Sequence, residues 1–150
     1  MVTGIKKRMA APVILGNLLP DNSVIFRALK SASFLNDSKT DLVDKAYFCH
    51  KGRDEDGLSF GRTAENAAMA LDKNHGVSSI PVGDVHNLGR ELDVYADSDP
   101  GFAGHALLKG LPMYEDNPTL ASDIAWELVH ISTIVHNRSY YPPGHPRHRP

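Results

Sequence analysis

The stretch ELDVYADSDPGFAGHALLKGL, residues 91–111, decides the fold class because it predicts two strands in direct succession. Residues 91–96 alternate between apolar and polar side chains, which is the pattern of a strand with one buried face. Residues 97–101 are a turn signal, and the next apolar run, residues 104–111, stops at Pro112. Two strands joined by a short turn, with no helix between them, favour antiparallel pairing.

Two other segments carry the start and stop signals of helices. Thr63 is a good N-cap for a helix over residues 63–75, and Gly76 is placed to end it. Asn117 caps a second helix, predicted over residues 118–136. The second segment carries a continuous apolar stripe made of Leu120, Ile124, Leu128, Ile131 and Val135. We expect this stripe to be buried against the sheet.

Further strands are predicted over residues 23–29, 46–50 and 77–85, and another begins at residue 58. The resulting order is three strands, a helix, two or three strands and a second helix, which does not alternate as a Rossmann layout does. The sequence therefore predicts a single α+β domain over residues 21–136. Its sheet is mostly antiparallel with about five to six strands, and its two main helices span residues 63–75 and 118–136.

The two ends of the chain differ from this domain. Residues 1–20 hold a basic triplet and then an apolar run, but Pro12 and Gly16 interrupt the run and no cleavage site follows. We expect an arm packed on the domain rather than a signal peptide. Residues 137–150 hold four prolines among Arg, Tyr and His, which predicts a disordered basic tail. Its arginines and tyrosines make the tail a candidate contact for a protein or a nucleic acid.

Composition is that of an ordinary globular domain. Of the 150 residues, 41% are hydrophobic and 23% charged, and the net charge of −2 argues against non-specific nucleic-acid binding by the domain as a whole. A single cysteine, Cys49, excludes an internal disulfide, and no apolar run is long enough to span a bilayer. We expect a cytoplasmic location. The histidines lack metal-site spacing, so we expect no metal site.

Arg27 and His105 are the polar residues with the most unusual predicted surroundings. Arg27 shares a strand face with Ile25 and Leu29, where a guanidinium pairs either with an anionic ligand or with an aspartate of the domain. His105 shares a face with Leu107 and Lys109, where an imidazole is a general base, a ligand or a core residue hydrogen-bonded to backbone. If the domain handles a phosphate-bearing ligand, we expect both to lie on one concave surface.

The segment Gly57-Leu58-Ser59-Phe60-Gly61, followed by an alanine-rich helix at residues 64–70, resembles the middle of ADP-ribosyltransferase folds. In that family a short strand of this kind leads into an alanine-rich helix beneath the NAD pocket. The resemblance covers residues 24–71. It implies that Arg27 holds the dinucleotide and that Ser59 or Phe60 lines the nicotinamide. The family's glutamate on a later strand has no counterpart here, because His105 occupies the best-formed late strand.

Three hypotheses for function follow. The first is an ADP-ribosyltransferase-like domain that binds NAD or a related nucleotide, with Arg27 on a phosphate, Ser59 in catalysis and Phe60 against the ligand. The second is a metal-independent, toxin-like ribonuclease with His105 as the base and Arg27 or Lys109 stabilising the phosphorane. The third is a non-catalytic interaction domain that uses the tail, residues 137–150.

Overall fold

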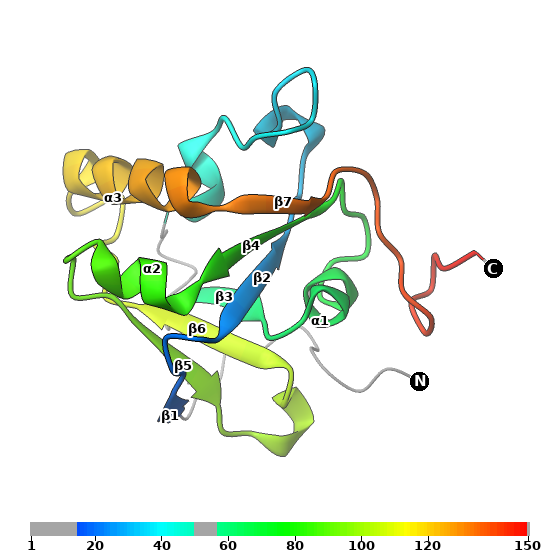
Figure 1. The fold of residues 1–150 in the computed structure, drawn as a ribbon, viewed down its shortest axis with the longest axis horizontal. Helices are drawn as coiled ribbons and strands as arrows, with labels where there is room; N and C mark the ends of the chain where they lie inside the picture. The colour runs from blue at the N-terminus through cyan, green and yellow to red at the C-terminus, as the bar shows by residue number, and fades with distance from the viewer. Residues whose placement is uncertain (1–14, 50–56, 150) are drawn as a thin grey trace.

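The computed structural model describes residues 15–49 and 57–149, and within these ranges the chain forms one antiparallel sheet (Figure 1). Its strands lie in the order β1-β5-β6-β3-β2-β4-β7. They are β1 (Leu15–Leu18), β2 (Val24–Ala28), β3 (Leu58–Gly61), β4 (Val77–Pro81), β5 (Asp93–Asp97), β6 (His105–Lys109) and β7 (Thr133–His136). The predicted α+β class with an antiparallel sheet is confirmed, although the sheet has seven strands rather than five or six.

Three α-helices and three short 3-10 helices complete the described ranges. The α-helices are α1 (Ala64–Met69), α2 (Val82–Asn87) and α3 (Pro118–Ile131), and the 3-10 helices are η1 (Ala32–Phe34), η2 (Lys45–Phe48) and η3 (Pro100–Phe102). The helices α1 and α3 begin at the predicted caps, since Thr63 and Asn117 each accept a hydrogen bond from a backbone N–H three residues on. No helix in the described residues is both long and apolar enough to cross a membrane.

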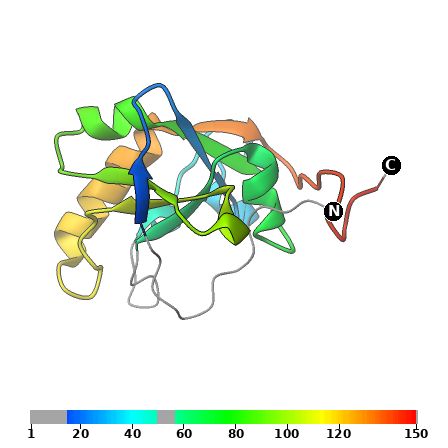
Figure 2. The ribbon, with the colours of Figure 1, turned by 90° about the horizontal axis from the view of Figure 1, so that it is seen from below.

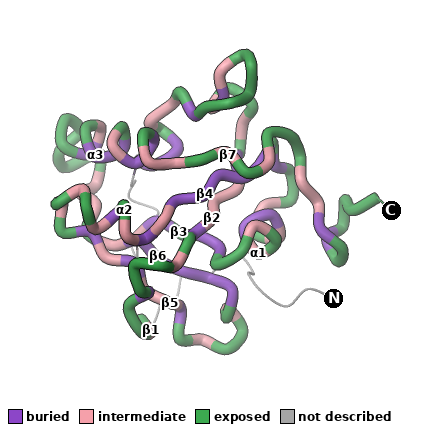
Figure 3. The backbone as a smooth tube through the Cα atoms, in the orientation of Figure 1, coloured by how far each residue is buried: buried purple, intermediate pink, exposed green. Residues whose placement is uncertain are grey.

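The register of the strands defines two faces of the sheet. Ile25 and Ile80 are cross-strand partners on one face, which α2, α3 and η2 cover to form the main core. We call it the α3 face. The opposite face carries Val77 and packs against Ala67 and Ala68 of α1, so we call it the α1 face. Figure 3 shows that the most deeply buried backbone belongs to the central strands between these two layers.

Three predicted elements have different ends or a different type in the structure. Residues 45–48 form the 3-10 helix η2 instead of a strand, because the Asp44 carboxylate accepts the backbone N–H of Ala46 and starts a turn. The strand predicted over residues 77–85 stops at Pro81, where the chain enters α2. Helix α1 ends at Met69, because the following residues return to extend the pairing of β2 through backbone hydrogen bonds between Leu29 and residues 75 and 76.

Helix α3 is also shorter than predicted. It ends at Ile131, and residues 133–136 are extended as β7, which pairs with β4 at the edge of the sheet. Thr133, Ile134 and Val135 are β-branched, so an available sheet edge favours them as a strand over a further turn of helix. The predicted apolar stripe is buried only in part. Ile124 and Leu128 are buried, whereas Leu120, in the first turn of α3, is exposed.

Residues 15–20 of the predicted arm and residues 137–149 of the predicted tail both contact the domain. The described part of the arm forms β1, which pairs with β5 at the edge opposite β7. The C-terminal segment runs beside α1 (Figures 1 and 2), instead of leaving the domain as a disordered tail. The Asn74 side chain, 1% exposed, donates to the carbonyl of Tyr140 and accepts its N–H, each at 2.9 Å. His145 is buried and lies 3.3 Å from the carbonyl of Leu71.

The paired hydrogen bonds of Asn74 give the first prediction. Asn74→Ala removes both partners from the Tyr140 backbone, so we expect a loss of about 1–3 kcal/mol in the free energy of unfolding. Thermal unfolding of this variant beside Asn87→Ala, at an exposed position, measures the effect. Removal of residues 139–150 is expected to lower Tm by at least as much as Asn74→Ala. An unchanged Tm in the truncated chain would contradict the docked segment.

The position of Leu128 gives a second prediction about the core. Its side chain is fully buried between α3 and the sheet. Leu128→Ala is expected to cost about 2–5 kcal/mol in the free energy of unfolding, because the substitution leaves a cavity in close-packed surroundings. Leu120→Ala, on the same helix but exposed, serves as the matched control and should change stability by less than about 1 kcal/mol. Denaturant unfolding of both variants compares the two positions.

Candidate functional site

Arg27 lies at the point where β2 and β3 separate. These strands share a single residue pair, Phe26 with Gly61, whereas β2 and β4 are paired along five residues. The Arg27 side chain lies on the α3 face, and its Nη1 donates to the carbonyl oxygen of Ser59 at 2.6 Å. A side-chain donor therefore takes the place that a backbone N–H of β2 would hold in a longer ladder. The guanidinium bridges the two strands.

Two aromatic rings flank this guanidinium. The Arg27 Cζ atom is 5.4 Å from the ring centre of Tyr47 and 5.6 Å from that of Phe60. Both distances are within the range of cation–π attraction, which keeps the flat guanidinium against the rings. The Tyr47 ring also lies 4.6 Å from Phe48, which stacks in turn on Phe60. The cation is thus held by a continuous aromatic cluster that belongs to the main core.

Tyr47 is tied to the backbone of β2 and to β4. Its buried hydroxyl donates to the carbonyl of Arg27 at 2.5 Å and lies 3.0 Å from the hydroxyl of Ser78. Burial raises the pKa of the Tyr47 phenol well above its ordinary value, and the smaller opposing effects are the charge of Arg27 and the hydrogen bond to Ser78. Tyr47 therefore stays neutral and acts as a fixed hydrogen-bonding group below Arg27.

The residues predicted to form the site divide between the two faces of the sheet. Phe60 points to the α3 face and contacts Arg27, but it is only 2% exposed and packs in the core. Ser59 is exposed and alternates with Phe60, so its side chain points to the α1 face while its carbonyl binds Arg27. The structure thus joins Arg27 to the segment 59–60, through one backbone atom and one ring.

His105 lies on the opposite face from Arg27. Its register partner is Gly61, and the register of β3 and β6 places it on the same face as Ser59, the α1 face. The expectation that Arg27 and His105 share one concave surface is therefore wrong, because the strand pairing directs their side chains to opposite sides of the sheet. A ribonuclease site that combines these two residues does not form.

His105 instead belongs to a buried pair. Its Nδ1 lies 2.8 Å from the carboxylate of Asp97, and both side chains are almost completely buried. The same carboxylate accepts the backbone N–H of Asp99, which begins the turn between β5 and β6. The partner of His105 in this pair is therefore a side-chain carboxylate and not a backbone group. Lys109 is at the other end of β6, opposite Asp93 of β5.

Metal chemistry has no support in the described ranges. They hold no group of three or more His, Cys, Asp or Glu side chains arranged to bind a metal ion. Cys49, the single cysteine, is buried with its sulfur near the carbonyl of Lys45. The comparisons of this chain with family models, curated proteins and solved structures found no match.

Sequence reasoning missed Tyr47 and Ser78, which support Arg27 from below. The sequence predicts a strand over residues 46–50, whereas Tyr47 lies in the 3-10 helix η2. The available signal was Asp44, a good N-cap three residues before Tyr47, the first residue of the aromatic pair at 47–48. Ser78 gave no signal, because its role depends on pairing across β4 with Arg27.

The raised pKa of Tyr47 predicts a specific loss of stability in alkali. The folded protein keeps this phenol protonated, whereas the unfolded chain ionises it above pH of about 10. The phenol's contribution to the free energy of unfolding is therefore fully present below about pH 10. Above that pH the free energy of unfolding falls by up to about 1.4 kcal/mol per pH unit. Tyr47→Phe should reduce the slope of unfolding free energy against pH above pH of about 10. Equal slopes in both proteins would contradict a buried neutral phenol.

Proposed function

We propose that this domain binds NAD or a related nucleotide, with a phosphate held by Arg27 in the manner of ADP-ribosyltransferase-like domains. The observation that supports the proposal most directly is the contact of Arg27 with residues 59 and 60. The sequence resemblance paired Arg27 with this segment, and Arg27 and Ser59 lie 32 positions apart in the chain. A hydrogen bond to Ser59 and a cation–π contact with Phe60 join them in the structure. A chance choice of distant residues rarely gives a contact.

The setting of Arg27 suits recognition of a phosphate. A guanidinium is planar, always charged and able to offer paired donors to two phosphate oxygens. The aromatic rings and the Ser59 carbonyl fix its orientation before a ligand arrives, which reduces the entropy lost on binding. Arg27 is neither fully buried nor fully exposed, so a ligand in this position would meet a partly desolvated charge.

The residues assigned to catalysis are less favourably placed than Arg27. The Ser59 hydroxyl is on the other face of the sheet, and His105 is sequestered with Asp97. The proposal therefore concerns binding, and Ser59 enters it through its carbonyl. The ribonuclease hypothesis loses the combination of His105 with Arg27, and the alternative cation, Lys109, lies at the opposite end of β6 from His105.

Binding of NAD and ADP-ribose by the whole chain, measured by titration calorimetry, tests the proposal. Arg27→Lys keeps the positive charge but loses the planar pair of donors, so we expect affinity to fall by about tenfold or more. Arg62→Ala is the matched control, because Arg62 is an exposed arginine directly after β3. This control should bind like the unchanged protein.

The melting temperature of each variant separates binding from structure. Arg27 also satisfies the Ser59 carbonyl, so Arg27→Ala is expected to destabilise the fold by about 1–3 kcal/mol. Loss of nucleotide binding in a folded Arg27→Lys protein supports the functional role. If the unchanged chain binds neither NAD nor ADP-ribose, while Arg27→Ala melts early, Arg27 is a structural bridge and the proposal fails.

A further inference from the structure

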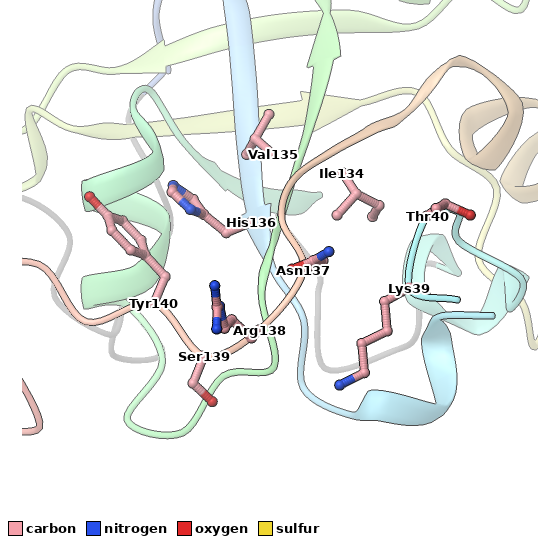
Figure 4. Close-up of a pocket in the computed structure, with 9 residues that line it drawn as sticks. All are labelled: Lys39, Thr40, Ile134, Val135, His136, Asn137, Arg138, Ser139 and Tyr140. Carbon is pink, nitrogen blue, oxygen red and sulfur yellow. The ribbon is translucent and has the colours of Figure 1, made fainter. Parts of the chain in front are cut away.

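A pocket of about 520 Å³ lies at the outer edge of the sheet, where β7 continues into the C-terminal segment. Figure 4 shows Lys39 extending from the loop before η2, the Arg138 side chain on the other side of the C-terminal segment, and the His136 ring turned toward Tyr140. Thr40, Asn137 and Ser139 add polar groups to the lining, which contains no carboxylate. This volume is in the range of small-molecule sites.

The loop that carries Lys39 is held in one conformation. The Asn36 side chain accepts the backbone N–H groups of Thr40 and Asp41, and the Asn36 carbonyl accepts the N–H of Lys39. Lys39 itself has φ of 59°, in the left-handed region that a lysine seldom adopts. The loop therefore presents the lysine from a closed turn rather than from a free segment.

The opposite wall is held just as firmly. Ser139 donates its hydroxyl to the carbonyl of Asn74, and Tyr140 is clamped by the Asn74 side chain. The Tyr140 ring stacks on His136 with 3.9 Å between centres and 7° between planes. These contacts fix residues 136–140 around Arg138, whose side chain is exposed. The pocket is thus a formed feature of the described fold.

The charges in this pocket are not neutralised by the described residues. Neither Lys39 nor Arg138 makes an ion pair within residues 15–49 and 57–149. The carboxylate of Asp41, in the same loop, accepts from Thr40 and Asn36. Two cations in the lining of one pocket, together with several hydroxyl and amide groups, favour an anion, and phosphate oxygens match both kinds of donor.

We propose that this pocket binds a small ligand with a pyrophosphate group, such as a nucleoside diphosphate. Lys39 and Arg138 would hold the phosphates, while Ile134 and Val135 provide an apolar wall for the remainder of the ligand. A small ligand is favoured over a nucleic acid because the volume of the pocket is that of a small-molecule site and the chain has a net charge of −2. The site is separate from Arg27, which points to β3, whereas β4 stands between β2 and β7.

Titration calorimetry of the full chain with pyrophosphate and with ADP, at low ionic strength, tests this site. Lys39→Asn removes the charge and keeps a residue that tolerates positive φ, and Arg138→Gln removes the second charge. Each is expected to weaken pyrophosphate binding by about tenfold, and the two together by more. Lys73→Gln, at an exposed position outside the pocket, is the matched control and should bind normally.

The Arg27→Lys variant separates this inference from the proposed function. Pyrophosphate binding that is lost in Lys39→Asn and Arg138→Gln but retained in Arg27→Lys supports the pocket. Binding that depends on Arg27 and is unaffected by the two pocket variants overturns it, and so does an unchanged chain that binds neither probe. Tighter binding of single-stranded oligonucleotides than of ADP also overturns it, because the basic residues would then serve an extended polyanion.

Discussion

The architecture depends on how β2 and β3 are held together where the two strands separate. A seven-stranded sheet needs continuous pairing across its middle, yet these two strands share only one residue pair. The guanidinium of Arg27 fills the gap by binding the Ser59 carbonyl, and the rings of Tyr47 and Phe60 hold it there. Without this bridge a backbone acceptor in the middle of the sheet would lose a partner. A charged side chain is therefore part of the frame that joins the two halves of the sheet.

The local signals in the sequence predicted the parts of the fold that are decided locally. Thr63 and Asn117 cap helices because their side chains reach backbone donors three residues away, and no distant residue is involved. The alternation in residues 91–96 marks β5 because one face of that strand is buried and the other is less so. These signals also identified the α+β class, since strands in direct succession pair antiparallel.

Other features were not predictable because they depend on distant partners. Residues 133–136 continue an amphipathic pattern that fits a helix, and they become a strand because β4 offers a free edge. The C-terminal segment has little apolar surface, but Asn74 binds its backbone from 66 residues away. Arg27 and His105 were expected to converge, yet the side to which each points depends on the register between β2, β3 and β6. A shift of one residue in that register would reverse the outcome.

The two sites proposed for phosphate differ in how closely binding is linked to stability. Arg27 bridges the sheet and is also the residue proposed to hold a phosphate, so a substitution there would change the free energy of unfolding together with that of the proposed binding. Lys39 and Arg138 are exposed and carry no described ion pair, so the pocket loses charge with little effect on the core. A binding residue that also holds the frame tolerates little variation, whereas exposed cations vary freely unless a ligand constrains them. Substitutions in the pocket would therefore report on binding alone, whereas a substitution of Arg27 would change stability together with any binding.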